Sequence, residues 1–168
     1  AVKLQLLDIF ACILGGAAAP GCRELCDAVT AWSCDRTATL LSDGRRTLPL
    51  FAALANGTMA QALDFDDTHD DGGTHSYAPV LPAVLAASQH RGDVSGKEFI
   101  TAVAVGVEIH CRLAVAARPR LHNGWHVTPL CGVFGAAAGA ARVLCGDQAG
   151  ILNAIGLAYS SACGTRQP

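Results

Sequence analysis

The sequence predicts an all-α protein, a bundle of six or seven helices with at most one short edge strand. Apolar residues recur at helical spacing through most of the 168 residues, and Pro, Gly and small polar residues stand where helices would begin and end. Strands do not alternate with helices along the chain, and no internal repeat is present. Residues 1–168 are therefore expected to form one helical domain or part of one.

The first half of the chain contains three expected helices and the expected strand. The helices cover residues 2–14, 21–34 and 49–64. Gly15-Gly16 ends the first of them, and Pro49, a favourable first-turn residue, begins the third. The run Thr37–Leu41 is β-prone and is followed by the turn sequence Ser42-Asp43-Gly44. It is expected to be an edge strand at most.

The second half contains four further expected helices. They cover residues 79–90, 96–116, 130–144 and 151–162. Ser95 and Glu98 form a capping box at the start of the second of these. Gly146 and Asp147 predict a tight turn between the last two, which are expected to be antiparallel. Three glycines of the third helix should admit a neighbouring backbone, namely Gly132, Gly135 and Gly139.

Composition bounds the class of protein and its partners. The net charge of −2 gives no reason to expect nucleic acid or an anionic membrane as a partner. The eight cysteines lie mostly in alanine-rich apolar stretches without a CxxC pair, which is typical of buried thiols in a reducing compartment. The chain does not begin with a signal-like basic segment. A cytoplasmic location is expected.

Apolar residues are unusually abundant, at 51% of the chain against 15% charged residues. Two uncharged stretches, residues 121–141 and 148–165, are long enough to mimic a membrane span. Each contains polar side chains, so buried helices without a membrane are expected. Because there is too little polar surface to coat a monomer, an apolar face should be covered by a partner or by a missing segment, and the intact protein is expected to be a homodimer.

The segment from Asp64 to His75 is the most polar part of the chain. Its sequence, DFDDTHDDGGTH, gathers five aspartates and two histidines. Such a cluster repels itself unless it meets a cation, a proton or a hydrogen-bonding ligand. It lies between two apolar segments, so part of it should contact the core. The sequence therefore predicts a functional site here, with a solvated helix end and loop as the alternative.

Two metal-dependent motifs match parts of this segment. The DxDxT pattern at residues 64–68 is found in haloacid-dehalogenase-type phosphotransferases, but that loop should follow a buried strand and a helix is expected here. Asp66-Asp67-x-x-Asp70 matches the magnesium motif of class I terpenoid synthases, which share an all-α fold. Those enzymes need aromatic walls, whereas aromatic residues make up only 5% of this chain.

Two further alternatives concern the rest of the chain. His122 and His126 have the spacing of the zinc-protease HExxH motif, but residue 123 is asparagine, so the general base of such a protease is missing. The segment could also be a non-catalytic dimerisation module whose acidic loop only caps a helix. His69 and His110 are expected to be structural.

Several long strings together resemble the helical domain of the MmgE/PrpD family. In order, they are ANGTMAQALDFDDTH, HSYAPVLPAVLAA, the capped apolar helix, GWHVTPLCGVFGAAAGAARVL and AYSSACGTRQ. The resemblance covers essentially the whole chain, and it is specific because the strings match in order. The family includes 2-methylcitrate dehydratase, cis-aconitate decarboxylase and iminodisuccinate epimerase.

The resemblance implies an active site formed by Asp64, Thr68, His75 and His126. His126, Asp64 and His75 are expected to be catalytic, and Thr68 to bind substrate. If the helix continues, Asp64 and Thr68 share one face, and Gly72-Gly73 lets the loop bring His75 to them. The implied reaction is proton transfer beside a carboxylate of a small polycarboxylate, without metal or organic cofactor. Histidine is a suitable base for it.

A hydro-lyase similar to 2-methylcitrate dehydratase is the first expectation, with cis-aconitate decarboxylase-like and iminodisuccinate epimerase-like activities as alternatives. Family members are longer, with a second, smaller α+β domain and catalytic lysines beyond residue 168. Substrate carboxylates need cations, and near the matched motifs this chain offers mainly Arg118, Arg120 and Arg166. The site is therefore expected to be incomplete, and the 168 residues alone to be inactive.

Overall fold

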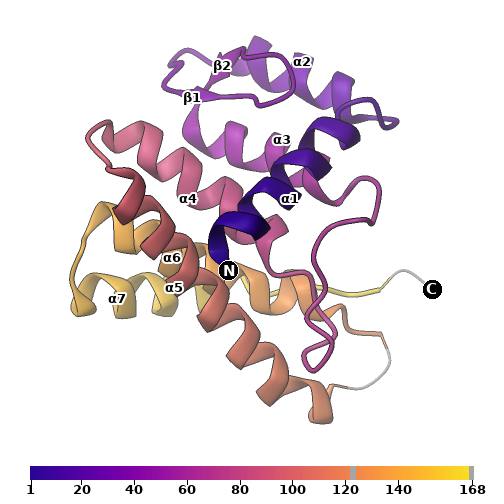
Figure 1. The fold of residues 1–168 in the computed structure, drawn as a ribbon, viewed down its shortest axis with the longest axis vertical. Helices are drawn as coiled ribbons and strands as arrows, with labels where there is room; N and C mark the ends of the chain where they lie inside the picture. Colours follow the sequence, from indigo (N-terminus) through magenta and orange to yellow (C-terminus); the bar gives the residue numbers. More distant parts are fainter. Residues whose placement is uncertain (122–123, 167–168) are drawn as a thin grey trace.

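The protein is a bundle of helices with one very small hairpin (Figure 1). The computed structural model describes residues 1–121 and 124–166. Its elements are α1 (Val2–Gly16), α2 (Cys22–Trp32), β1 (Ala38–Thr39), β2 (Arg46–Thr47), α3 (Pro49–Gln61), α4 (Tyr77–Arg91), α5 (Gly96–Ala117), the 3₁₀ turn η1 (Arg118–Arg120), α6 (Val127–Leu144) and α7 (Gln148–Tyr159). The predicted all-α class is confirmed.

Local side-chain chemistry sets several helix ends. At the start of α5, the Ser95 hydroxyl accepts a hydrogen bond from the Glu98 amide, and the Glu98 carboxylate accepts one from the Ser95 amide. Asp147 starts α7 by accepting a hydrogen bond from the amide of Gly150 at 2.7 Å. Between α6 and α7, Gly146 has a φ of +80°. These ends agree with the sequence prediction.

Two elements differ from the prediction. Helix α3 ends at Gln61, and Asp64, which was expected to lie on it, has a φ of +51°. That left-handed conformation cannot continue an α-helix. The β-prone run is not a lone strand, because β1 pairs with β2 in an antiparallel hairpin. Buried Asn56 of α3 holds this hairpin by accepting from the Leu41 amide and donating to the Thr39 carbonyl, both at 2.9 Å.

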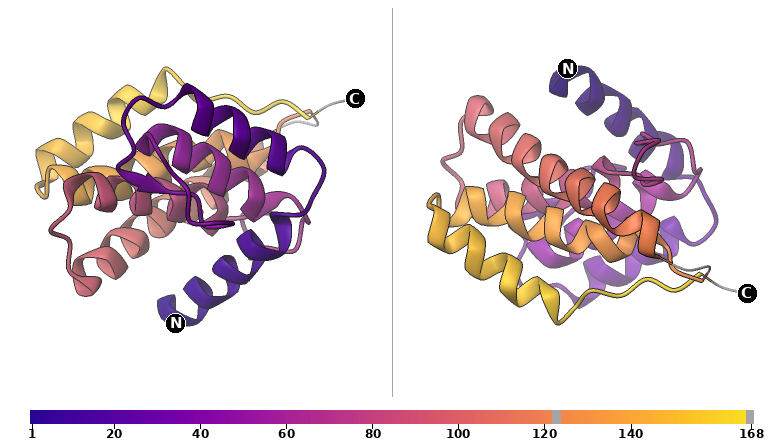
Figure 2. Two further views of the ribbon diagram at one scale, coloured as in Figure 1. Left: turned by 90° about the horizontal axis from the view of Figure 1, so that it is seen from above. Right: turned by 90° about the horizontal axis from the view of Figure 1, so that it is seen from below.

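Helix α6 is central to the second half of the bundle. It packs against α4, α5 and α7, and the view from below in Figure 2 shows α5, α6 and α7 side by side. A Cβ atom on Gly135 would lie 2.7 Å from the carbonyl oxygen of Gly106, and the reverse distance is also 2.7 Å. The backbones of α5 and α6 therefore touch, as the glycines of α6 predicted.

The main hydrophobic core lies between α1, α2, α3, α4 and α5. Its largest fully buried apolar side chains are Ile9, Ile13, Leu40, Met59, Leu81, Val29, Val80, Val84 and Val103. Helix α1 buries only one face in this core, and its other face exposes Leu4, Leu7 and Leu14. The described part of the chain thus leaves an apolar stripe along α1 uncovered.

Two helical segments meet the length and composition criteria for a membrane span, Gly96–Arg120 and Val127–Leu144. The second is half buried inside the bundle. The first carries an exposed ion pair between Glu108 and Arg112, at 2.6 Å. Helices in the core of a bundle meet the same criteria.

The cysteines are free thiols, all eight of them. Four are buried, namely Cys12, Cys22, Cys26 and Cys131, whereas three are exposed, namely Cys34, Cys145 and Cys163. The expectation of buried thiols is therefore met for half of the set.

Candidate functional site

The segment between α3 and α4 folds back on itself as a closed loop (Figure 1). The His69 amide donates to the Thr74 carbonyl at 2.8 Å, and the Gly73 amide, in a turn with a φ of +59°, donates to the His69 carbonyl at 2.8 Å. From η1, the Arg118 guanidinium donates to the Asp71 carbonyl at 3.0 Å. The loop returns the chain to the start of α4, as its two glycines predicted.

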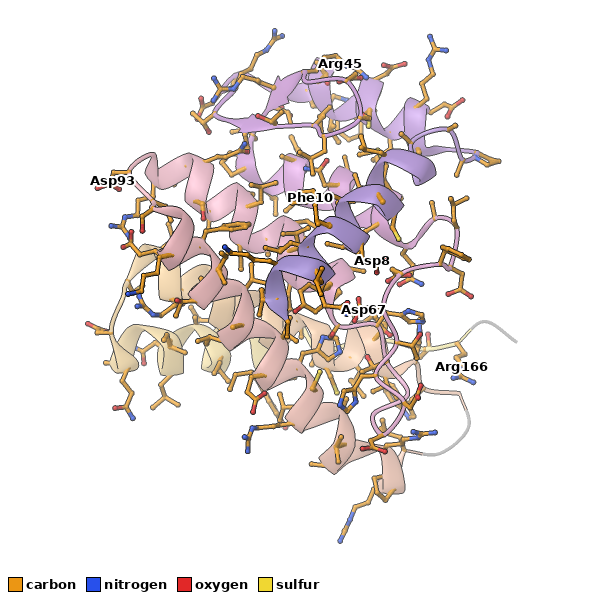
Figure 3. All side chains as sticks on the ribbon, in the orientation of Figure 1. Asp8, Phe10, Arg45, Asp67, Asp93 and Arg166 are labelled. Atoms are coloured by element: carbon orange, nitrogen blue, oxygen red, sulfur yellow. The ribbon has the colours of Figure 1, made fainter. Side chains whose placement is uncertain are left out.

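Asp67 caps the N-terminal end of α4. Its carboxylate accepts hydrogen bonds from the amides of Ser76 and Tyr77, both at 3.0 Å, and from the Ser76 hydroxyl at 2.7 Å. Bonds to a charged acceptor satisfy amides that have no partner inside the helix. Figure 3 shows Asp67 where the loop meets the body of the bundle. This member of the acidic cluster is therefore structural.

His75 lies between two other carboxylates of the cluster. Its Nε2 is 3.6 Å from Oδ1 of Asp64, and its Nδ1 is 3.4 Å from Oδ1 of Asp66. The Asp64 side chain is 80% exposed and that of Asp66 is 0% exposed. Burial raises the pKa of Asp66, and the adjacent His75 opposes that shift. The loop thus brings Asp64 and His75 together as predicted, although no helical face is involved.

A buried chain of polar groups fixes the backbone at His75. The His75 amide donates to the Thr128 hydroxyl of α6 at 3.0 Å, and this hydroxyl is 3.2 Å from that of Thr74. The Thr74 hydroxyl is in turn 2.7 Å from Nε2 of His110, which is fully buried in α5. Burial lowers the pKa of His110 to about 4. Its ring is therefore neutral near pH 7, in agreement with a structural role.

His126 precedes α6 and is held by the segment that follows α7. The His126 amide donates to the Gly164 carbonyl at 2.9 Å, and the Arg166 amide donates to the Gly124 carbonyl at 2.7 Å. This pairing brings Arg166 to the same edge of the molecule as the acidic loop (Figure 3). His122, the partner of His126 in the HExxH comparison, lies outside the described residues.

The environment of His126 suits a proton acceptor. Burial lowers its pKa, and the positive charges of Arg166 and His75 lower it further, while Asp64 opposes them. Asp64 and His75, the pair at the acidic loop, are among the groups that shift the pKa of His126. A histidine with a lowered pKa is neutral near pH 7 and keeps a free lone pair.

A groove of about 450 Å³ opens beside His126. Apolar residues of α3, α4 and the start of α6 form most of its wall, and Gln61 and Thr128 add polar groups. The Gln61 side chain also donates to Asp64 at 3.1 Å. Gln61 thus links the groove to the acidic segment. Gln61 lies within the string ANGTMAQALDFDDTH that carries the family resemblance, but it was not among the predicted site residues.

Thr68 is placed differently from the prediction. Its expected position beside Asp64 required a continuous helix, and α3 ends at Gln61, so that premise is wrong. Thr68 lines a separate cavity of about 490 Å³ together with Asp67 and Tyr77. Its role in substrate binding stays a prediction.

Asp64, Asp66 and His75 could together hold a cation, since one ligand atom from each lies within 4.8 Å of the others. The terpenoid-synthase motif needs a different set, in which Asp67 and Asp70 join Asp66. Asp67 instead bonds the start of α4, and Asp70 is exposed on the loop. The described residues do not support that alternative.

Comparisons with known proteins find a matching family model and several relatives. Residues 1–168 match the model of the MmgE/PrpD N-terminal domain. The chain is 34% identical to the cis-aconitate decarboxylase of Aspergillus terreus over 172 residues, which cover 96% of this chain and 34% of that protein. It is 33% identical over 170 residues to the cis-aconitate decarboxylase-like protein oryM of Aspergillus oryzae, with 96% of this chain and 35% of that protein covered.

A shorter match reaches a mammalian protein. The cis-aconitate decarboxylase of Mus musculus is 32% identical over 104 residues, which cover 59% of this chain and 21% of that protein. The chain spans about a third of the length of the Aspergillus relatives. Because the family model matches the chain from residue 1 to residue 168, the chain belongs to the MmgE/PrpD family.

Proposed function

We propose that the intact enzyme is a lyase that acts on a small polycarboxylate by moving a proton next to one of the substrate's carboxylate groups. The observation that carries the proposal is geometric: Gln61 lines the groove beside His126 and bonds Asp64, and Asp64 lies 3.6 Å from His75, in a chain of the MmgE/PrpD family. The reaction as proposed uses neither a metal nor an organic cofactor.

His126 is the proposed general base. Its lowered pKa leaves the imidazole neutral, and a neutral imidazole beside a groove can take a proton from a bound substrate. Removal of a proton next to a carboxylate moves negative charge onto that carboxylate, and a nearby cation stabilises this charge. Arg166, which the pairing of residues 124–126 with 164–166 brings to His126, is the proposed cation.

His75 is the proposed second proton-transfer group. Two carboxylates within 3.6 Å are suitable partners for an imidazole that carries an extra proton. Such a group can protonate a leaving hydroxyl or the carbon that has lost a carboxylate. Asp64, held by Gln61 and largely exposed, is the member of the pair that a substrate can reach. Dehydration and epimerisation use both the base and the acid. In decarboxylation the electron pair of the breaking carbon–carbon bond stays on the substrate carbon, and only the acid is needed to protonate that carbon.

Decarboxylation of cis-aconitate is the first reaction to test, because relatives of this chain bear the name cis-aconitate decarboxylase. Dehydration of 2-methylcitrate, which the sequence resemblance put first, and epimerisation of iminodisuccinate are the alternatives. The intact enzyme should be assayed with all three compounds, and release of carbon dioxide from cis-aconitate is the expected result. An intact enzyme that turned over none of them would contradict the proposal.

We further propose that the intact enzyme is a homodimer and that these 168 residues alone are inactive. The leucine stripe of α1 and exposed Leu152 and Leu157 of α7 are apolar surfaces that soluble proteins usually cover. The chain also spans about a third of its relatives' length and offers few cations to a polycarboxylate. A monomer in sedimentation at micromolar concentration would contradict the first expectation, and turnover by the purified 168 residues the second.

A further inference from the structure

Asp66 and Asp67 are adjacent and chemically identical, but their carboxylates have different surroundings. Asp67 accepts three hydrogen bonds at the start of α4. The Asp66 side chain is fully buried, and within residues 1–121 and 124–166 neither of its oxygens accepts a hydrogen bond. A buried carboxylate without hydrogen bonds costs stability, and its burial raises the pKa of Asp66. A protein usually keeps such an unfavourable group only at a functional site.

The ring of His75 lies against Asp66, with Nδ1 3.4 Å from Oδ1. This nitrogen also has no hydrogen-bond partner among the described residues. The opposite nitrogen, Nε2, is turned toward the exposed Asp64, and the His75 amide is bonded to Thr128. The protein thus holds the backbone and the Nδ1 side of His75, and Nε2 is on the side that a substrate can reach.

We propose that Asp66 is a positioning residue for His75: its carboxylate, 3.4 Å from Nδ1, attracts the Nδ1–H group, keeps the proton of the neutral ring on that nitrogen and thereby makes Nε2 the nitrogen that gains or loses the catalytic proton. This inference rests on the proposed function, in which His75 transfers a proton. In the transfer the Nε2–H bond breaks, its electron pair stays on nitrogen, and the proton forms a new bond to the substrate. The Nδ1–H bond stays intact throughout, and its hydrogen faces the Asp66 carboxylate. Without that carboxylate, a neutral His75 can carry its proton on either nitrogen.

The test compares Asp66→Asn with Asp67→Asn in the intact enzyme, with cis-aconitate, 2-methylcitrate and iminodisuccinate as substrates. For Asp66→Asn we expect kcat to fall by roughly 10–10³-fold while KM stays within about threefold. Its apparent Tm should be unchanged or higher, because the amide removes a buried charge. Asp67→Asn should show the reverse, with a lower Tm and kcat within about threefold of wild type. An Asp66 that only stabilised the fold would lose Tm and kcat together.

A spectrum gives a second readout that does not depend on turnover. With ¹⁵N-labelled histidine in the intact enzyme, and with His75→Gln to assign the signal, neutral His75 should carry its proton on Nδ1 in wild type. In Asp66→Asn the two tautomers should mix. Asp70→Asn, at an exposed position of the same loop, is the control and should keep the wild-type tautomer. An unchanged tautomer in Asp66→Asn would overturn the inference.

The outcomes separate this inference from the proposed function. Full activity of Asp66→Asn together with loss of activity in His75→Gln would overturn the positioning role and leave the proposed function standing. Activity in both His75→Gln and His126→Ala would overturn the proposed function itself. A divalent cation bound one to one by the wild-type enzyme and lost from Asp66→Asn would make Asp66 a metal ligand, which also overturns the positioning role.

Discussion

The contact between α5 and α6 and the segment from Asp64 to Ser76 meet at His110, yet they are held together in opposite ways. At the helix contact, backbone lies on backbone, and the glycines at 106 and 135 leave no room for a side chain. In the loop segment, hydroxyls, carboxylates and imidazoles hold the chain, through Asp67 at α4 and Thr128 at α6.

The two regions also differ in what they leave unsatisfied. The helix contact buries apolar and backbone groups that already have partners inside their helices. The loop segment buries Asp66 without a hydrogen bond among the described residues and turns Asp64 into a left-handed conformation. The tightly packed helices therefore support a loop segment in which a few groups, Asp66 and Asp64 among them, are held in unfavourable surroundings. These unfavourable groups lie at the candidate site. Substitutions in the helix contact should therefore mainly lower stability, whereas substitutions at the candidate site should mainly lower activity.

The largest effect is expected from His126→Ala in the intact enzyme. Loss of the proposed base should lower kcat by roughly 10²–10⁴-fold, the usual contribution of a positioned acid or base, while the apparent Tm changes little. Steady-state kinetics and thermal unfolding measure the two quantities. His90→Ala, at an exposed position near the end of α4, is the matched control and should keep the wild-type rate. A wild-type kcat in His126→Ala would mean that another group moves the proton.

His110, where the two regions meet, should make the stability of the protein depend on pH. Burial lowers its pKa from 6.5 to about 4, so the unfolded chain takes up a proton at a higher pH than the folded one. The stability is complete above pH 6.5 and should fall by up to about 3 kcal/mol as the pH falls from 6.5 to 4.

Thermal unfolding between pH 7 and pH 4 measures this dependence. His110→Gln keeps a polar partner for Thr74 but cannot take up the proton, so its Tm should fall less over the same range. Equal slopes for the variant and the wild type would assign the acid sensitivity to other groups.

Gly135→Ala tests the helix contact. The new Cβ would meet the Gly106 carbonyl oxygen at 2.7 Å, so the helices must move apart, and a loss of about 1–3 kcal/mol is expected. Gly156→Ala in α7 is the matched control, because no described atom outside its own stretch of helix lies within 4 Å of its Cβ position, and it should add up to about 1 kcal/mol. Thermal unfolding of the two variants gives the difference directly. A Gly135→Ala protein as stable as Gly156→Ala would show that the helices are not in close contact.

The smallest effect is expected at Arg166, the residue proposed to bind a substrate carboxylate through its positive charge. Arg166→Ala should raise KM by about tenfold, which corresponds to about 1.4 kcal/mol of binding, with a smaller change in kcat. Arg166→Lys keeps the charge and should recover part of the loss. Arg36→Ala, an exposed arginine before β1, serves as control. If Arg166→Ala and Arg36→Ala had the same KM, Arg166 would not bind substrate.

The helix bundle can be predicted from the sequence better than the candidate site can, for physical reasons. The Ser95–Glu98 capping box and the Gly146–Asp147 turn act within a few residues, so their effect is local and readable. The close contact at Gly135 was also readable, because glycine lowers helix stability, and its repetition along an apolar helix indicates that a second backbone packs there. The number and type of helices follow from such local signals.

Contacts between distant residues decide the site, and no local pattern contains them. The residues that end α3, from Ala62 to Asp64, are compatible with a helix, so Asp64 and Thr68 were expected to share a helical face that the structure does not form. Asp66 and Asp67 are indistinguishable in sequence, although one faces His75 and the other bonds amides nine and ten positions along the chain. The family resemblance selected Asp64, Thr68, His75 and His126, and their functional roles stay predictions.

The pairing of residues 124–126 with 164–166 has a consequence for the order in which a ribosome makes this protein. Asp64 and His75 belong to segments that leave the ribosome early and can pack with α4 and α5 as these emerge. The amide of His126 receives its partner only when Gly164 has been added, after the whole of α7. The nascent chain therefore contains the acidic loop for some time before His126 is fixed, so the candidate site is completed only after translation has passed this segment.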